Sequence, residues 1–220
     1  RQVMSRPVVT VPYQATVATA LALFRDHNLK RLPVVDQAGH LAGLLTRSDL
    51  LRELAFEEAT RGDQASFFDW DARVDEVELE PAVIVNATTP LSALLPMMQR
   101  ALQVRAVVVN SAHQAIGMIS ERDLLTRVEK NQRAGVMAAL RDQSALDPLH
   151  LAQTAADLMT TPVITVNVEC RVFDAIRLLM DNQIKRLPVI DHDGNVIGLV
   201  NRRTLLYGLL REQTPRKQEN

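Results

Sequence analysis

Apolar and polar residues follow one another along the chain in an order that predicts a β-α-β-β-α unit. Residues 7–11 are a short β-branched run that begins with a proline, which is typical of the start of a strand. Residues 16–24 begin with a threonine suited to capping a helix and carry apolar residues at amphipathic spacing. Two apolar runs, 32–35 and 41–45, predict strands joined by a glycine-containing loop. Residues 48–55 predict a closing helix with its leucines on one face.

The unit occurs three times. Residues 31–36 read Arg-Leu-Pro-Val-Val-Asp and residues 186–191 read Arg-Leu-Pro-Val-Ile-Asp, a separation of 155 positions that holds along the two copies without a gap. A fainter copy lies between them at a separation of 74 and keeps Arg105, Gly117 and Asp123. A repeated sequence predicts a repeated fold, and any site that one copy carries is expected in the others.

Composition and charge narrow the class of protein. At 220 residues and 47% apolar content, the chain is long enough for three units that pack on one another. A formal net charge of −1, with acids and bases interspersed, provides no basic field for nucleic acid. The single cysteine, Cys170, excludes an internal disulfide framework and fits a reducing compartment. We find no apolar run long enough for a membrane span and no signal peptide, so we expect a cytoplasmic location; we also expect further residues upstream of Arg1.

Each unit resembles a cystathionine-β-synthase (CBS) domain. The shared pattern is a proline before the first strand, a basic residue and Pro-Val-hydrophobic-Asp in the second, and Gly-hydrophobic-hydrophobic-Thr-x-x-Asp after the third. The middle copy departs from it with Val107 and Asn110 in place of the proline and the aspartate. The resemblance predicts CBS repeats at 1–54, 78–130 and 155–212, a linker at 55–77, a helical linker at 131–154 and a tail at 213–220.

The resemblance also implies an architecture and a ligand. The implied fold is α+β, with repeated β-α-β-β-α units that pair through their sheets and helices as in a Bateman module. Members of the family often bind adenine nucleotides in the clefts between paired units and usually regulate an attached or partner protein. We therefore expect AMP or ATP as a regulatory ligand, S-adenosylmethionine as an alternative, and no metal beyond Mg²⁺ with ATP.

Two residue pairs at predicted strand-to-helix junctions are candidate ligand contacts: Thr46 with Asp49, and Ser120 with Asp123. From spacing alone, a hydroxyl followed three positions later by an acid is a capping box that needs no ligand. A capping box prefers Glu or Gln as the acid, because the shorter Asp reaches the cap N–H less well. The CBS resemblance implies a ribose contact for these two aspartates, which favours the ligand interpretation.

The third copy breaks this pattern with Asn201 and Thr204. Asparagine still caps a helix, so the structure is expected to survive. The carboxylate is lost, and we expect no nucleotide site of the family type in this copy.

Basic residues lie beside the candidate pairs. Lys30, Arg31 and Arg105 precede the second strand of their copies, where the CBS resemblance implies contact with bound phosphates and where arginine offers a planar fork. The alternative is a solvated charge ahead of a buried strand. Arg47 and Arg122 fall in the first turn of the closing helices, an unfavourable place for a cation unless it pairs or meets an anion, so they join the candidate ligand contacts.

Other chemistry is sparse. We find no glycine-rich phosphate loop, nucleophile elbow, paired catalytic carboxylates or metal-ligand spacing among the histidines, so we predict that the chain is not an enzyme. An aromatic cluster, Phe67, Phe68 and Trp70, lies in the first linker. It either packs as a lid over the core of a repeat, which we favour, or anchors a partner.

The leading hypothesis is a regulatory module that binds an adenine nucleotide and acts on an unknown partner or upstream domain; the alternative is a structural dimerisation module with empty clefts. Copy one resembles copy three more than copy two. We therefore predict that repeats one and two pair within the chain, while repeat three pairs with the same repeat of a second chain to form a homodimer. In the alternative, repeats two and three pair, and repeat one finds its partner in another chain or upstream of Arg1.

Overall fold

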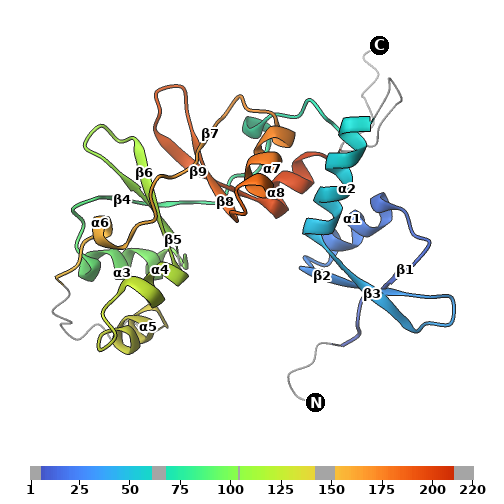
Figure 1. The fold of residues 1–220 in the computed structure, drawn as a ribbon, viewed down its shortest axis with the longest axis horizontal. Coiled ribbons are helices and arrows are strands. Elements are labelled where there is room, and N and C mark those ends of the chain that lie inside the picture. The colour runs from blue at the N-terminus through green and yellow to red at the C-terminus, as the bar shows by residue number, and fades with distance from the viewer. Residues whose placement is uncertain (1–5, 61–67, 104, 142–151, 211–220) are drawn as a thin grey trace, which may run out of the picture. The chain divides into compact units, whose positions relative to one another are not determined.

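The computed structural model describes residues 6–60, 68–103, 105–141 and 152–210, and Figure 1 shows their helices and strands. Within these residues there are three small sheets, one for each sequence repeat, with strand orders β1-β2-β3, β4-β5-β6 and β7-β8-β9. Along the chain, each repeat has a strand, a helix, two strands and a closing helix in the same order. The predicted α+β class is therefore confirmed.

The first repeat has the predicted order of elements. They are β1 (Val11–Pro12), α1 (Val17–Asp26), β2 (Arg31–Val35), β3 (Leu41–Thr46) and α2 (Arg47–Thr60). β1 lies parallel to β2, and β3 lies antiparallel to it. Thr16 caps α1 as predicted, because its Oγ1 accepts a hydrogen bond from the backbone N–H of Thr19 at 3.2 Å. The strand predicted at 7–11 is displaced toward the C-terminus, because only Val11 and Pro12 pair with β2.

The other two repeats follow the same order. The second contains β4 (Val83–Asn86), α3 (Leu91–Arg100), β5 (Arg105–Val109), β6 (Ala115–Ser120) and α4 (Glu121–Arg127). The third contains β7 (Val166–Asn167), α7 (Val172–Asp181), β8 (Arg186–Ile190), β9 (Val196–Asn201) and α8 (Arg202–Gly208). A short 3₁₀ turn, η1 (Val74–Glu76), lies ahead of β4, α5 (Arg133–Arg141) follows the second repeat, and α6 (Ala155–Leu158) lies at the start of the third.

The described residues form two compact units that divide the third repeat between them. One unit comprises those of 1–77, 171–185 and 201–220, and the other comprises those of 78–170 and 186–200. The sheet of the third repeat therefore belongs with the second repeat, whereas α7 and α8 belong with the first. We call the unit that contains the first repeat with α7 and α8 the helical unit. We call the unit that contains the second repeat with the sheet of the third the sheet-pair unit.

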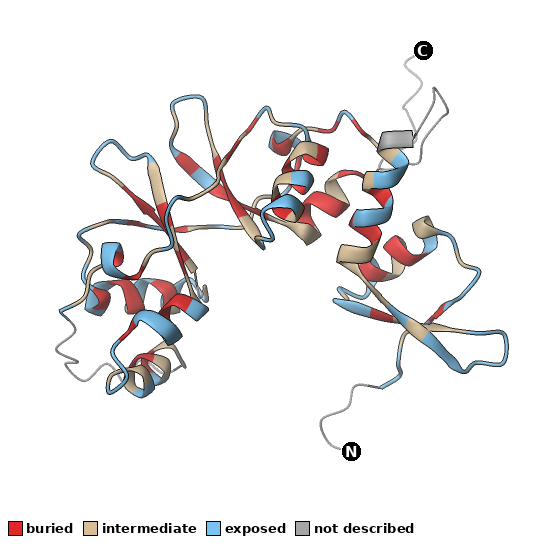
Figure 2. Cartoon of the chain, in the orientation of Figure 1, coloured by how far each residue is buried: buried red, intermediate tan, exposed pale blue. Residues whose placement is uncertain are grey.

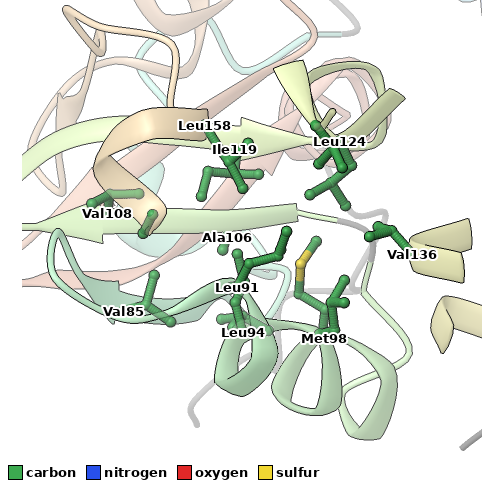
Figure 3. Packing of buried hydrophobic residues seen from close by; sticks show 14 of the residues in the cluster. Val85, Leu91, Leu94, Met98, Ala106, Val108, Ile119, Leu124, Val136 and Leu158 are labelled. Carbon is green, nitrogen blue, oxygen red and sulfur yellow. The ribbon is translucent and has the colours of Figure 1, made fainter. Parts of the chain in front are cut away.

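The sheet-pair unit has a closely packed core on the helical face of the second repeat. Leu91, Leu94 and Met98 of α3 pack with Ile119 of β6 and Leu124 of α4, and all five side chains are buried. Figure 3 shows these side chains filling the space between the helices and the strands of this sheet. The amphipathic spacing along the chain is thus the cause of the helical layer.

The opposite face of the same sheet packs against the sheet of the third repeat. Val107 and Val109 of β5 form a buried cluster with Val196 and Leu199 of β9. Repeats two and three therefore pair within the chain, and the prediction that repeats one and two do so is wrong. Similarity between copies was its only basis, and similarity in sequence does not report which copies touch. We call this cluster the sheet seam.

The helical unit joins the first repeat to the helices of the third. α2 packs against both α7 and α8. The hydroxyl of Tyr207 in α8 donates a hydrogen bond to the backbone carbonyl of Phe24 in α1 at 2.9 Å. In this unit the first and third repeats contact each other through helices, whereas the second and third repeats pair through their sheets. The two kinds of contact that the resemblance implies, through sheets and through helices, are therefore both observed.

The aromatic segment after α2 is part of the core of the helical unit. Phe68 and Trp70 are buried and pack edge to face with ring centroids 5.5 Å apart, and Trp70 packs edge to face on Phe173 of α7 at 5.6 Å. The favoured interpretation as a lid over a repeat core is confirmed for these two residues. Phe67 lies outside the described residues.

The sheet seam makes a stability prediction. Leu199→Ala is expected to lower the free energy of unfolding by about 2–5 kcal/mol, because it removes a side chain that is 1% exposed from the seam. Urea-induced unfolding measures the change. Leu102→Ala is the matched control, because Leu102 is 93% exposed, and its effect is expected to stay within about 0.5 kcal/mol. A loss in Leu199→Ala no larger than that of the control would contradict the pairing of repeats two and three.

Candidate functional site

The candidate pair of the second repeat lies where β6 passes into α4. The backbone N–H and the hydroxyl of Ser120 both donate to Oδ2 of Asp123, at 2.8 Å and 2.6 Å. Asp123 is only 9% exposed, which is unusual for a carboxylate. The structure therefore forms the capping box that the spacing predicts.

A segment that leads into the third repeat covers this carboxylate. The hydroxyl of Thr160 donates to Oδ1 of Asp123 at 3.0 Å, and Nε of Arg127 lies 3.6 Å from the same oxygen. Arg127 also donates to the backbone carbonyl of Met159 and to the hydroxyl of Thr160. Thr160 in turn pairs with Met118 of β6 through both of its backbone groups. We call residues 158–160 the lead-in of the third repeat.

The first repeat forms the same cap with less cover. The backbone N–H and hydroxyl of Thr46 donate to Oδ2 of Asp49, at 2.9 Å and 2.7 Å. Oδ1 of Asp49 has an ion pair with the exposed Arg52 at 3.5 Å, and the Asp49 side chain is 39% exposed. The chemistry at the two junctions is therefore alike, but in the described residues only Asp123 is covered by another repeat.

The third repeat keeps its cap without a carboxylate, as predicted. Oδ1 of Asn201 accepts from the backbone N–H groups of Arg203 and Thr204, and Oγ1 of Thr204 accepts from the N–H of Asn201 at 3.0 Å. The Thr204 hydroxyl donates to the backbone carbonyl of Asn201 at 3.1 Å. The side-chain oxygens of Asn201 and Thr204 are thus used inside their own repeat.

These caps correct one step of the sequence argument. Aspartate was expected to reach the cap N–H poorly, yet Asp49 and Asp123 accept from it at 2.9 Å and 2.8 Å. A fourth box, Thr154 with Asp157, has the same geometry at 2.8 Å, and its hydrogen bonds lower the pKa of Asp157. The choice of Asp over Glu therefore does not favour a ligand.

A cluster of charges lies beside the Ser120–Asp123 pair. Arg105 is the register partner of Ser120 in the β5–β6 ladder, so their side chains lie on the same face of the sheet. Nε of Arg186, at the start of β8, donates to Oε2 of Glu80 at 2.9 Å. Burial and the nearby charge of Arg186 lower the pKa of Arg105, while Glu80 and Glu121 raise it. The charges of Arg186, Glu80 and Glu121 therefore act on Arg105, the ladder partner of Ser120.

The other predicted basic residues are not gathered in this way. Arg31 is the register partner of Thr46 and is exposed, as is Lys30. Arg122 is exposed on α4. The guanidinium of Arg47 lies over the ring of Tyr207, 5.9 Å from its centroid, and its Nε and Nη2 have no hydrogen-bond partner among the described residues. Arg47 thus packs α2 against α8, and this contact accounts for a cation in the first helical turn.

Sequence reasoning missed three participants in the site: Thr160, Arg127 and Glu80. Thr160 and Glu80 lie ahead of the first strand of their own repeats, and each contacts the repeat paired with it. Their contacts depend on which repeats pair. Arg127 stands four residues after Asp123 on α4, a spacing that predicts an ion pair and was the one available signal.

Comparison with known proteins now identifies the family. The model of the CBS domain matches residues 1–56, 74–130 and 155–211, so the chain belongs to the CBS domain family. The resemblance stated from the sequence is confirmed, including the presence of three repeats.

Solved structures share the fold along nearly the whole chain. A crystal structure of an uncharacterized conserved protein from Pyrococcus horikoshii has a TM-score of 0.65 at 25% identity, with 94% of this chain and 80% of that chain covered. Protein MJ1225 from Methanocaldococcus jannaschii has a TM-score of 0.59 at 20% identity, with 94% and 69% covered. The fold is therefore shared with these two proteins.

Two curated sequence relatives are longer than this chain. The uncharacterized protein MJ1404 from Methanocaldococcus jannaschii is 27% identical over 203 residues, which are 91% of this chain and 41% of the relative. The uncharacterized protein MK0525 from Methanopyrus kandleri is 34% identical over 100 residues, 46% of this chain and 43% of the relative. The chain thus matches less than half the length of these two curated relatives.

Two further findings concern the described residues alone. No three His, Cys, Asp or Glu side chains in them gather as a set of metal ligands. In the same part of the chain, no helix combines the length and the apolar character that crossing a membrane would need.

The buried cap makes the next prediction. Asp123→Ala is expected to lower the free energy of unfolding by about 1–3 kcal/mol, because the N–H of Ser120 and the hydroxyl of Thr160 lose their acceptor. The double variant Ser120→Asn with Asp123→Thr copies the cap of the third repeat and is expected to recover most of that loss. Urea-induced unfolding of the three proteins tests this. Equal stability of Asp123→Ala and the parent would show that the cap contributes nothing.

Proposed function

We propose that the chain is a regulatory module that binds an adenine nucleotide, AMP or ATP, at the Ser120–Asp123 junction of the sheet-pair unit. One observation carries the proposal: a buried carboxylate accepts from a hydroxyl at a junction that a second CBS repeat covers, and Arg105 is the ladder partner of the residue that carries that hydroxyl. A carboxylate suits the paired hydroxyls of a ribose, and a guanidinium suits a phosphate. The nucleotide ligand implied by the family resemblance calls for this combination.

The two carboxylate oxygens have different roles in this proposal. Oδ2 of Asp123 accepts both hydrogen bonds of the cap and stays with Ser120. Oδ1 faces the lead-in and accepts from Thr160. A ribose hydroxyl therefore takes the place of the Thr160 hydroxyl on Oδ1 while the cap is retained.

The phosphate end is assigned to the arginine cluster. Arg105 and Arg186 repel each other, and Glu80 and Glu121 offset the repulsion in part. An anion between the two guanidinium groups removes that repulsion, so a charged phosphate is favoured over a neutral nucleoside. With ATP, Mg²⁺ would accompany the phosphates; S-adenosylmethionine remains the alternative ligand, and its positive charge is disfavoured by the same cluster.

Regulation follows from the contact that the ligand replaces. Arg127 and Asp123 hold the lead-in on the second repeat, and Thr160 is the residue that both of them contact. A nucleotide that displaces the Thr160 hydroxyl weakens this attachment, and it has different affinity for the attached and the released lead-in. Such a difference in affinity is what allows a ligand to shift a conformational equilibrium. The module acts by binding, without chemistry on the ligand, and passes the change to a partner protein or to a further domain of the full protein.

The rival proposal is a structural dimerisation module whose clefts stay empty. The observation in its favour is that both oxygens of Asp123 already have protein partners. On that interpretation the cap and the lead-in attachment are the whole purpose of the carboxylate. The two proposals differ in whether nucleotide binding is measurable at all.

The ribose assignment is tested by calorimetry with AMP and with ATP. Asp123→Ala is expected to raise the dissociation constant about 10- to 150-fold, the scale of losing hydrogen bonds to a charged group. The Ser120→Asn, Asp123→Thr double variant is the key control, because it keeps a cap but lacks the carboxylate, and it is expected to bind as poorly as Asp123→Ala. Thr204→Ala, in the third repeat, is expected to leave the affinity unchanged.

Three results would count against the assignment. Absence of binding to the parent would favour the structural module. Full affinity in the double variant would show that Asp123 acts only through its cap. A large loss in Thr204→Ala would show that the third repeat carries a working site.

The phosphate assignment is tested with AMP and adenosine. Arg105→Gln is expected to weaken AMP binding about 10-fold or more and to leave adenosine binding unchanged, because only AMP has the charged group that the guanidinium contacts. Arg122→Gln is the matched control, since Arg122 is exposed on α4. Equal losses for AMP and adenosine in Arg105→Gln would mean that Arg105 supports the fold of the cleft rather than the phosphate.

A further inference from the structure

A groove lies between α2 and α7 inside the helical unit. Its volume is about 240 Å³, and its lining combines three apolar and three charged side chains: Ala55, Phe173 and Met180, with Glu58, Arg177 and Asp181. Figure 2 shows both buried and exposed residues along each of these helices. Sites for drug-sized ligands have volumes of roughly 300–1,000 Å³, so this groove suits a smaller molecule.

The apolar part of the groove is backed by the core of the unit. Phe173 is 2% exposed and packs edge to face on the buried Trp70. Ala55 and Met180 are half-buried. The lining therefore offers a fixed apolar surface to the stem of a ligand.

The three charged side chains of the groove have no hydrogen bond or ion pair among the described residues. Arg177 and Asp181 are four positions apart on α7, a spacing at which opposite charges can pair, yet they form no ion pair there. Glu58 acts at longer range on Arg171, because its charge adds to the larger effect by which the hydrogen bonds to Asp174 raise the pKa of Arg171. Both signs of charge are therefore available to a ligand.

The other repeats show that the shared fold does not require these residues. Arg177 corresponds to Ala22 in the first repeat and to Pro96 in the second. Phe173 stands where the first repeat has Ala18. Helices α1 and α3 form without a guanidinium at this position. The lining of the groove is thus particular to the third repeat.

Asp181 lacks the partner that its counterpart has. In the first repeat the counterpart is Asp26, which forms an ion pair with Arg25 at 3.0 Å. The residue of the third repeat that corresponds to Arg25 is Met180, which lines the groove. The third repeat therefore has an apolar side chain and a carboxylate open to a ligand where the first repeat has an ion pair.

The charges of the groove define their complement. Two carboxylates and one guanidinium favour a ligand with two cationic groups and one anionic group. The effect of Glu58 on Arg171 places Glu58 near the start of α7, whereas Asp181 is the last residue of that helix. The two carboxylates thus lie toward opposite ends of the groove.

The length of the lining agrees with a ligand that is charged at both ends. From Phe173 to Asp181, α7 extends about 12 Å at about 1.5 Å per residue. A basic α-amino acid has an aliphatic stem with an ammonium group at each end and a carboxylate at one of them. This pattern matches both the charges and the apolar surface between them.

We propose that this groove binds a free basic α-amino acid, lysine or ornithine. Arg177 holds the α-carboxylate, Asp181 holds the neighbouring α-ammonium group, and Glu58 holds the ammonium group of the side chain. The aliphatic stem lies on Phe173 and Met180. The site belongs to the helical unit, so the proposal is independent of nucleotide binding in the sheet-pair unit.

Calorimetry of the full chain with four ligands tests the ligand class. L-Lysine is expected to bind at least about 10-fold more tightly than L-norleucine, which lacks the side-chain ammonium group, and than cadaverine, which lacks the carboxylate. Nα-acetyl-lysine amide represents a lysine of a partner protein, and it is expected to bind as weakly because both α-charges are absent. No binding of L-lysine at millimolar concentration, or equal binding by any of the other three, would overturn the proposal.

Two variants test the residues. Arg177→Ala copies the first repeat and is expected to weaken lysine binding about 10-fold while cadaverine binding stays unchanged. Glu58→Gln is expected to weaken lysine binding about 10-fold while norleucine binding stays unchanged. Arg177 is exposed and Glu58 is half-buried, so unchanged circular dichroism spectra are expected.

Glu53→Gln is the matched control, because Glu53 is an exposed acid of α2 that does not line the groove. Its lysine affinity is expected to equal that of the parent. Unchanged lysine affinity in Arg177→Ala or in Glu58→Gln, or an equal loss in the control, would overturn the assignment of these residues.

Discussion

Sheet-to-sheet packing between the second and third repeats buries Val107 and Val109 of β5 with Val196 and Leu199 of β9. The sheet of the second repeat has helices on its other face, so this seam is where its remaining apolar surface leaves water. Burial of each such side chain is worth about 1.5–3 kcal/mol. The reciprocal strand bridges and the position of the lead-in at Asp123 both follow from this packing. Without the seam, the candidate site would lose the repeat that covers it.

The carboxylate of Asp123 is tolerated in a buried place because the fold satisfies it. Ser120 and Thr160 donate to its two oxygens, and Arg127 offsets its charge. A buried carboxylate without such partners would carry a large desolvation cost. In the proposed site, a ribose would have to replace the hydrogen bond that Thr160 already donates to Oδ1. The gain in binding free energy at Oδ1 would therefore be modest, and the phosphate contacts of the proposal would have to supply the remainder.

Prediction from the sequence succeeded where the information is local. The order of strands and helices in each repeat, the cap by Thr16 and the surviving cap at Asn201 depend on residues a few positions apart. The capping pairs at Asp49 and Asp123 were found for the same reason. The argument that aspartate is too short for the cap failed, because the cap N–H lies within 3 Å of both carboxylates. The contact of Arg47 with the ring of Tyr207 could not be predicted, since Tyr207 lies far away in sequence.

The sequence by itself determined that there are three copies of one β-α-β-β-α unit, which junctions carry a carboxylate and which copy lacks one. These properties depend on residue type and short spacing, and both are fixed along the chain. The tertiary structure decided which copies meet, because identical apolar faces are compatible with more than one pairing. That choice placed Thr160 on Asp123, brought Arg105 beside Arg186 and left the face of Leu44 open. Contacts between residues tens of positions apart have no signature in local sequence, so only the folded chain could define them.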